Sequence, residues 1–351
     1  MKFLIFGGSV FLSRAVAKEA LARGHQVSCL SRGDSGPAPR GTHHIVADRD
    51  EETDPRAGTW TGLASHEWDA VIDVARTPSW VDTALAALAD RVRHWTFVST
   101  ISVYADLSTP GGTPENTPTL PPATGDLDGG ADPTSYGQNK MACELAVQRA
   151  MDGRCLIARP GLIAGPGDPS GRYTYWPERL SRGGKVLVPR PPEAQTQLVD
   201  VRDLAQWLVR MSEEGGTGTY DTVAPAMTFA ELLAQTGEGV RRAKVPGREG
   251  KPPVRLIWAD PEELRQHDVR PWAGPRSLPL WLPDEEYAGM RDRDVTSTLA
   301  AGLSPRPLAD TAHDTLRWVA EASGARKSGL TWDEEQDVLA SLSEGEPSPV
   351  A

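Results

Sequence analysis

The stretch Phe3-Leu4-Ile5-Phe6-Gly7-Gly8-Ser9 decides the fold that the sequence predicts. Its first four residues form an apolar run of strand length, and the glycines that follow are typical of a tight turn. From Phe11 to Arg23 apolar residues recur at helical spacing, and Gly24 ends this predicted helix. Residues 25–30 then read as a second strand. This βαβ unit has the length of a right-handed crossover, and it predicts a parallel sheet.

The same alternation continues through the N-terminal half of the chain. Short apolar runs alternate with stretches at helical spacing, which is the pattern of a doubly wound α/β domain. The predicted strands cover residues 44–47, 70–74, 95–98 and 155–158, and the predicted helices cover residues 80–89 and 135–150.

The pattern changes in two places. Residues 106–133 are rich in Pro, Gly, Thr and Asp without periodicity, which indicates a lid or a mobile surface loop. After Gly161 the alternation becomes irregular, which indicates a second, smaller unit in which Thr228 begins a helix through a capping box. We therefore predict a Rossmann-type domain over 1–165, completed by about 198–224. A smaller α/β substrate-binding part covers 166–197 and 225–300, and C-terminal helices and a tail cover 301–351.

Composition excludes several classes of protein. The 351 residues include 48 acidic and 37 basic side chains, for a net charge of −11, which argues against nucleic acid as a partner. No apolar run approaches the roughly 20 residues that cross a bilayer, so we expect no membrane association. The N-terminus lacks a signal-peptide pattern, and the three cysteines are too few and scattered for a disulfide framework. We expect a soluble, cytoplasmic protein.

A tyrosine and a lysine lie four residues apart in the predicted helix 135–150. Tyr136 and Lys140 therefore share one helix face, so that the phenol and the ammonium lie close together. The preceding strand, residues 95–98, is followed at once by Ser99 and Thr100. Hydroxyl groups at the carboxyl end of a parallel strand are typical of a ligand site.

With these motifs the chain resembles the extended short-chain dehydrogenase/reductase family, also called the NAD(P)-dependent epimerase/dehydratase family. The resemblance covers most of residues 1–320. It rests on Gly7-Gly8, Ser99-Thr100, Tyr136 with Lys140, residues 159–167 (RPGLIAGPG) and residues 198–205 (LVDVRDLA).

The resemblance implies a role for each matching residue. Tyr136 is expected to be the general acid/base at the substrate oxygen, Lys140 to lower its pKa and hold the nicotinamide ribose, and Thr100 to hydrogen-bond the reacting group. Asp48 is expected near the adenine. The residues expected to bind the cofactor are Gly7, Ser9, Val10, Phe11, Leu12, Ser31, Arg32, Asp48, Val74, Ala75, Ser99, Lys140, Pro160, Leu162 and Ile163.

The chain departs from the family pattern at three places. The Gly-x-x-Gly-x-x-Gly turn keeps Gly7 but has Val10 and Ser13 in the other two places, which puts cofactor affinity in question. The second strand ends in Ser31-Arg32 without a carboxylate, which favours the 2′-phosphate of NADP and leaves NAD open. Family dehydratases have an Asp-Glu pair after the threonine, where this chain has Ile101-Ser102, so we do not expect a dehydratase.

Two groups of residues leave a structural and a functional interpretation open. Tyr173, Tyr175 and Trp176 line a substrate pocket in one interpretation and belong to the core in the other. His43 and His44 have no partner at metal spacing, so we expect no metal site.

The sequence thus predicts an NADP-dependent oxidoreductase, a ketoreductase or dehydrogenase, acting on a small or medium carbonyl or alcohol such as a sugar or natural-product intermediate. One alternative is a sugar-nucleotide epimerase that retains NAD. The other is a non-catalytic Rossmann-fold binding protein. The family resemblance also leaves a homodimer through the helix over 141–150 open.

Overall fold

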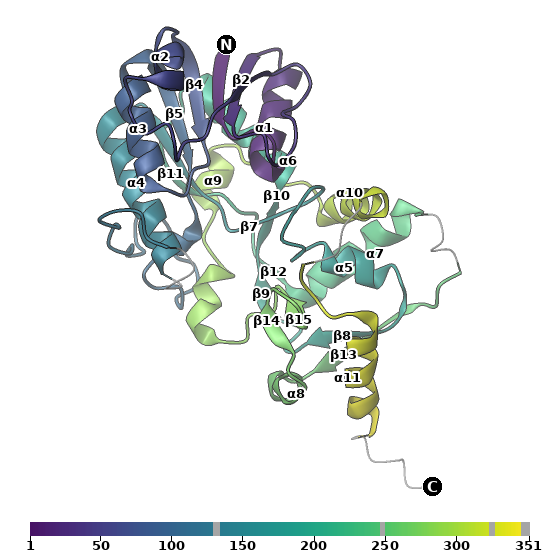
Figure 1. The fold of residues 1–351 in the computed structure, drawn as a ribbon. Helices are drawn as coiled ribbons and strands as arrows, with labels where there is room; N and C mark the ends of the chain where they lie inside the picture. Colours follow the sequence, from purple (N-terminus) through teal and green to yellow (C-terminus); the bar gives the residue numbers. More distant parts are fainter. Residues whose placement is uncertain (129–133, 246–249, 323–326, 345–351) are drawn as a thin grey trace, which may run out of the picture. The chain divides into compact units, whose positions relative to one another are not determined.

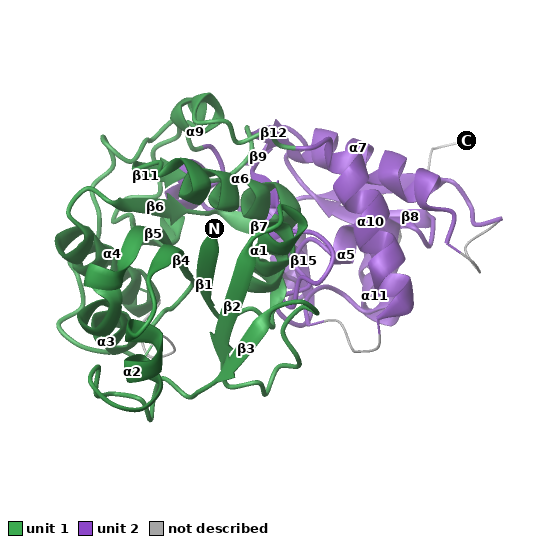
Figure 2. Cartoon of the chain, turned by 90° about the horizontal axis from the view of Figure 1, so that it is seen from above, with its two compact units in different colours: residues 1–162, 201–225, 293–305 green, residues 163–200, 226–292, 306–351 purple. Residues whose placement is uncertain are grey.

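The computed structural model describes residues 1–128, 134–245, 250–322 and 327–344, without the side chains of residues 343 and 344. It divides the chain into two compact units (Figure 2). Unit 1 consists of residues 1–162, 201–225 and 293–305, and unit 2 consists of residues 163–200, 226–292 and 306–351. Residues 163–165 and 198–200, predicted in the Rossmann-type domain, thus group with unit 2. Residues 293–305, predicted in the substrate-binding part and the C-terminal helices, group with unit 1. The predicted functions of the parts stay predictions.

Unit 1 is built on a seven-stranded sheet in which every described pair of neighbouring strands is parallel. The strands in the middle of the sheet are almost continuously apolar because helices cover both faces, and Phe3, Leu4 and Ile5 have no exposed surface. In spatial order the strands are β11 (Gly218–Asp221), β6 (Cys155–Arg159), β5 (Val92–Val98), β4 (Trp68–Asp73), β1 (Lys2–Phe6), β2 (Gln26–Ser31) and β3 (His43–Val46).

Helices cover this sheet on its two faces (Figures 1 and 2). One face carries α1 (Phe11–Ala22) and α6 (Val201–Glu214), which pack against each other. The other carries α2 (Gly58–Ala64), α3 (Pro78–Leu88) and α4 (Ser135–Met151), which share a core with β1, β4 and β5. Shorter elements are η1 (Ala89–Arg91), η2 (Ile101–Val103) and α9 (Thr296–Ala300). The predicted fold class, a Rossmann-type doubly wound sheet, is confirmed.

The strand order fixes where a site can lie. The chain begins in the middle of the sheet at β1, adds β2 and β3 on one side and then β4 to β6 and β11 on the other. The order reverses between β1 and β4, and ligands of such sheets bind outside the carboxyl ends of the strands at this reversal. The segments that follow β1, β4 and β5 therefore share one edge of the sheet, as the sequence predicted.

Unit 2 contains short strand pairs and helices. The described sheets pair β7 with β10, β8 with β13, β9 with β12 and β14 with β15, and the β8–β13 pair was not predicted. Thr228 caps α7 through the predicted capping box with Glu231. The elements are β7 (Leu162–Ala164), α5 (Tyr175–Leu180), β8 (Gly184–Pro189), β9 (Gln195–Thr196), β10 (Leu198–Asp200), β12 (Met227–Thr228), α7 (Phe229–Ala243), β13 (Val254–Ala259), α8 (Pro261–Gln266), β14 (Arg270–Trp272), β15 (Ser277–Pro279), η3 (Glu285–Met290), α10 (Leu308–Glu321) and α11 (Trp332–Glu344).

The described part of the predicted lid or surface loop, residues 106–128, is held by hydrogen bonds within unit 1. The amide of Leu120 donates to the carbonyl of Val103 at 2.7 Å, and the amide of Ala123 donates to the carbonyl of Gln138 at 3.0 Å. The side chain of Asn139 on α4 bonds both the amide and the carbonyl of Leu127. Residues 129–133 of the predicted loop lie outside the described residues.

A network of four buried charges joins distant segments of unit 1. Arg159 at the end of β6 forms two hydrogen bonds with Glu144 on α4, at 3.0 and 2.6 Å, and also donates to the hydroxyl of Tyr104. That hydroxyl donates to Asp221 at 2.7 Å, and Arg293 donates to the other oxygen of Asp221 at 2.8 Å. Two positive and two negative side chains balance one another, as buried charges require.

We expect Arg159→Leu to lower the free energy of unfolding by about 3–5 kcal/mol, because it leaves the buried Glu144 without its counter-charge. Arg91→Leu removes an arginine from an exposed pair with Glu67 and should change it by less than about 1 kcal/mol. Urea denaturation measures both. Equal losses of stability in the two variants would contradict the larger contribution expected of the buried pair.

Candidate functional site

Helix α4 is held against the carboxyl end of β5 by two close contacts. The ammonium of Lys140 donates a hydrogen bond to the carbonyl of Val98, the last residue of β5. One turn earlier, a Cβ atom added to Gly137 would lie 2.1 Å from the carbonyl oxygen of Ser102. Only glycine allows this approach. Lys140 and Gly137 on α4 therefore lie against the segment 98–102. The role of Tyr136, one turn before Lys140 on the same helix, stays a prediction.

The segment after β5 presents hydroxyl groups. The Oγ1 atom of Thr100 accepts the amide of Ser102 at 3.1 Å, which caps η2, and its own hydroxyl donates to the Oγ of Ser102 at 3.2 Å. Ser99 is buried, and its amide bonds the carbonyl of Ala158. Ser102 is a hydroxyl that the sequence analysis did not assign, although its place two residues after Thr100 is the signal for it.

Lys140 is buried, with 1% of its surface exposed, and its ammonium is bonded to the protein. Besides Val98, it donates to the carbonyl of Ala75 at 2.6 Å, and it lies 4.2 Å from the centre of the Phe97 ring. Burial lowers the pKa of Lys140 from 10.5 to about 8, because an ammonium loses hydration inside the protein. The lysine therefore stays largely protonated at neutral pH.

The glycine turn after β1 has backbone that other residues rarely adopt. Gly7 and Gly8 have φ of 114° and 108°, and a Cβ on Gly8 would lie 2.6 Å from the sulfur of Cys29. Ser13, in the place of the third family glycine, packs against Gly7 and donates a hydrogen bond to the carbonyl of Val10 at 2.9 Å. Serine at this position is thus compatible with close packing of helix and strand.

The start of α1 is compatible with a phosphate group. Val10, in the place of the second family glycine, is the N-cap of α1, makes no side-chain capping bond and is 43% exposed. Phe11 has a φ of 31°, unusual for a side chain of its size. No side chain caps the first backbone amides of α1. These amides, that of Leu12 included, are therefore available to an anion, and Ser9 lies in the turn just before them. The turn therefore fits a dinucleotide despite Val10.

The end of β2 carries the residues predicted to select the cofactor. The hydroxyl of Ser31 bonds Nε2 of His44 on β3 at 2.9 Å. The guanidinium of Arg32 is half exposed and lies 3.6 Å from Asp34 and 3.9 Å from Asp48. Arg32 is thus at the expected edge of the sheet and accessible, but two carboxylates already share its charge.

The remaining predicted cofactor residues lie at or after the ends of strands. Val74 and Ala75 directly follow β4, and Pro160 directly follows β6, where its carbonyl accepts the amide of Ile101. Leu162 is buried and Ile163 is partly exposed, both in β7.

Two charged residues at this edge were not predicted. Arg49 follows Asp48 directly, and its buried guanidinium lies 3.4 Å from Asp73, the last residue of β4. It is surrounded by the rings of Phe6, Trp60 and Trp80, at 4.6, 5.9 and 5.4 Å. A charged residue within an apolar strand, as Asp73 is in WDAVID, was the signal for this pair.

Tyr173, Tyr175 and Trp176 belong to the core of unit 2. None has exposed surface, so the structure favours the core interpretation over the pocket interpretation. The ring of Trp176 packs edge-on against Tyr175 and Phe229, and its Nε1 donates to the carbonyl of Pro279 at 2.9 Å. The hydroxyl of Tyr173 bonds Thr236.

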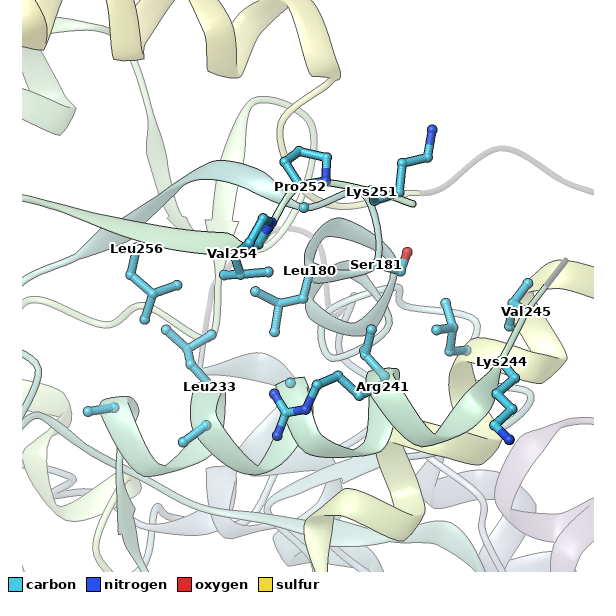
Figure 3. Close-up of a pocket in the computed structure, with 17 residues that line it drawn as sticks. Leu180, Ser181, Leu233, Arg241, Lys244, Val245, Lys251, Pro252, Val254 and Leu256 are labelled. Atoms are coloured by element: carbon cyan, nitrogen blue, oxygen red, sulfur yellow. The ribbon is translucent and has the colours of Figure 1, made fainter. Parts of the chain in front are cut away.

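Two cavities lie away from these residues. One of about 890 Å³ in unit 2 is bordered by α5, α7 and β13, where Leu180, Leu233, Val254 and Leu256 converge and Arg241 lies along α7 (Figure 3). Another of about 610 Å³ lies in unit 1 at the amino ends of β1 to β4, the opposite edge from Lys140. The described residues contain no cluster of metal-binding side chains, and no helix among them is long and apolar enough to span a membrane.

Comparisons with known proteins support the predicted family and fold. The NAD dependent epimerase/dehydratase family matches residues 81–222, which include Thr100, Tyr136 and Lys140. This confirms the resemblance and indicates an enzyme, and by its description the family depends on NAD. No curated protein matches the chain.

Solved structures similar to this chain share its fold. An enzyme from Bordetella bronchiseptica, WbmH, in complex with NAD⁺ has 18% identity and a TM-score of 0.61, covering 91% of this chain and 98% of that one. The UDP-N-acetylglucosamine 4-epimerase of Bacillus cereus has 16% identity and a TM-score of 0.63, covering 92% and 100%. The UDP-glucose 4-epimerase of Thermotoga maritima, solved with UDP-glucose, has 16% identity and a TM-score of 0.63, covering 92% and 99%.

We expect Gly137→Ala to lower the free energy of unfolding by about 1–3 kcal/mol, because the added methyl group collides with the backbone carbonyl of Ser102. Gly62→Ala, in α2, is the matched control. Its methyl group meets open space, and alanine favours helix, so stability should rise by up to about 1 kcal/mol. Thermal and urea unfolding of both variants test the contact, and a Gly137→Ala protein as stable as the wild type contradicts it.

Proposed function

We propose that the chain is an NADP-dependent oxidoreductase that interconverts a carbonyl and an alcohol on a small or medium organic substrate, such as a sugar or natural-product intermediate. The observation that supports this proposal is the contact of α4 with the end of β5, in which Lys140 bonds Val98 and Gly137 lies against Ser102, and Tyr136 lies one turn before Lys140 on the same helix. When bound at the glycine turn, a nicotinamide dinucleotide supplies the hydride transfer.

The residues of the chain then transfer the proton and orient the substrate oxygen. Tyr136 gives a proton to the oxygen in the direction of reduction and removes it in the direction of oxidation. A phenol has a pKa near 10, so it needs a neighbouring cation to act as a base near neutral pH, and Lys140 is that cation. Thr100, with Ser102 beside it, hydrogen-bonds the same oxygen and orients it.

The choice of NADP rests on the end of β2. Ser31 and Arg32 stand where an NAD enzyme of this fold has a carboxylate for the ribose hydroxyl, and an arginine there suits the additional phosphate. The resident Asp34 and Asp48 are near enough to hold Arg32 in place until a phosphate displaces them.

A second candidate function is a sugar-nucleotide epimerase, in which the hydride returns to the same substrate carbon. It is favoured by the similar structures, several of which are named as 4-epimerases, one of them solved with UDP-glucose. The two functions differ in cofactor retention. An epimerase that recycles its hydride is expected to keep NAD through purification, whereas the reductase exchanges NADP and NADPH with solution. Extraction of nucleotide from purified protein distinguishes them, and failure to bind either dinucleotide favours a non-catalytic binding protein.

We expect Arg32→Ala to weaken NADPH binding about 10- to 100-fold, because a charge-assisted bond to phosphate is worth about 1.5–3 kcal/mol. NADH binding should change less than about threefold. Arg91→Ala, which removes an exposed arginine at the other edge of the sheet, is the control and should leave both affinities unchanged. Fluorescence titration of the three proteins gives the dissociation constants. Equal weakening for NADPH and NADH contradicts the proposed role of Arg32.

We expect Tyr136→Phe to reduce turnover at least about 100-fold, with NADPH affinity nearly unchanged, because the variant lacks only the transferable proton. The measurement is the oxidation of NADPH with a carbonyl substrate found by screening. Tyr220→Phe, whose ring packs against Trp207 on α6, is the control and should turn over normally. A Tyr136→Phe enzyme with wild-type turnover contradicts the assignment of the acid/base.

A further inference from the structure

The Arg49–Asp73 pair is a buried charged group that the proposed chemistry does not use. Both residues lie at the carboxyl edge of the sheet, with Asp73 fully buried and Arg49 8% exposed. Burying an ion pair in this apolar surrounding costs free energy. The hydrogen bonds of the pair indicate what it does at this edge of the sheet.

The bonds form a chain from Arg49 to Lys140. Arg49 also donates to the carbonyl of Trp80, which fixes its guanidinium beside the carboxylate of Asp73. The Oδ1 atom of Asp73 accepts the amide of Ala75 at 2.9 Å, and this bond shapes the turn after β4. The carbonyl of the same Ala75 accepts the ammonium of Lys140 at 2.6 Å. The acid therefore orients the peptide that the lysine binds.

Asp73 also acts on Lys140 through its charge, from a pair with Arg49 that is longer, at 3.4 Å, than the pair of Glu144 with Arg159, at 2.6 Å. Among the described residues, Cys143, Asp73, Glu144 and Arg76 are titratable groups that act on the ammonium. Burial raises the pKa of Cys143 to about 12, so its thiol is uncharged near neutral pH. Glu144 is already neutralised by its two bonds to Arg159. Arg76 is a cation, and its charge lowers the pKa of Lys140.

We propose that Asp73, itself held in place by Arg49, is the positioning residue of Lys140: it orients the Ala75 carbonyl and supplies the counter-charge that keeps the buried ammonium protonated. The inference rests on the proposed function, in which Lys140 is the cation beside Tyr136. It predicts that loss of the Asp73 charge lowers the pH at which Lys140 loses its proton. The high-pH limit of turnover then moves to lower pH.

The experiment is an NMR titration of protein labelled with ¹³C at Cε of lysine. The chain has seven lysines, and Lys140→Arg identifies the signal of Lys140 by its loss. Asp73→Asn removes the charge while its amide oxygen can still accept the Ala75 amide. We expect the Lys140 midpoint in this variant to fall by at least about one pH unit. Asp69→Asn is the matched control, because Asp69 lies on the same strand in a more exposed pair with Arg93, and it should leave the midpoint unchanged.

An unchanged Lys140 midpoint in Asp73→Asn, or an equal shift in Asp69→Asn, overturns the proposal. Asp73→Ser carries the same expectation if the asparagine variant does not fold, since serine is smaller and can also accept an amide two residues on. The titration needs neither substrate nor dinucleotide. Its outcome is therefore separate from that of Tyr136→Phe, which tests the proposed function itself.

Discussion

The arrangement of the carboxyl edge of the unit 1 sheet depends on the hydrogen bonds of one buried ammonium, that of Lys140. It bonds the carbonyl that ends β5 and a carbonyl in the turn after β4, and it does so from α4. One cation thus ties a helix to the ends of two neighbouring strands, β4 and β5, at the carboxyl edge of the sheet. A lysine ammonium has three donors and no acceptor, so a site that buries it must provide oxygen atoms from several directions. The segments after β4 and β5 provide them.

Close contacts at two glycines also hold this edge of the sheet. The approach of Gly137 to Ser102 and of Gly8 to Cys29 leaves no space for side chains. Glycine at these points therefore serves packing within unit 1. This explains why the turn after β1 keeps its form although Val10 and Ser13 stand where the family has glycine. The essential positions are Gly7 and Gly8, whose backbone has positive φ.

The sequence predicted the fold of unit 1 well because the spacing of apolar residues and the turn residues that bound each element are local signals. Each strand of unit 1 except β11 was predicted, since buried parallel strands are short apolar runs bounded by turns. Tyr136, Lys140 and Thr100 could be placed at one edge because parallel strands end together. Unit 2 was predicted less well, because the pairing of β8 with β13 joins segments about 70 residues apart and leaves no local pattern. Asp73 was missed although its place in the apolar run WDAVID was a signal, and Arg49 was missed because it is an ordinary charged residue until the fold brings the two together.

The network of Tyr104 and its charged neighbours has a consequence for how the chain is made. The chain passes between the two units after residues 162, 200, 225, 292 and 305, so unit 1 is not a continuous segment. Asp221, at the end of β11, receives its guanidinium partner from Arg293, which lies beyond the whole second segment of unit 2. During synthesis from the N-terminus, all seven strands of the sheet emerge while this buried carboxylate still lacks Arg293. Unit 1 therefore cannot reach its final charge balance on the ribosome until most of unit 2 has also been translated.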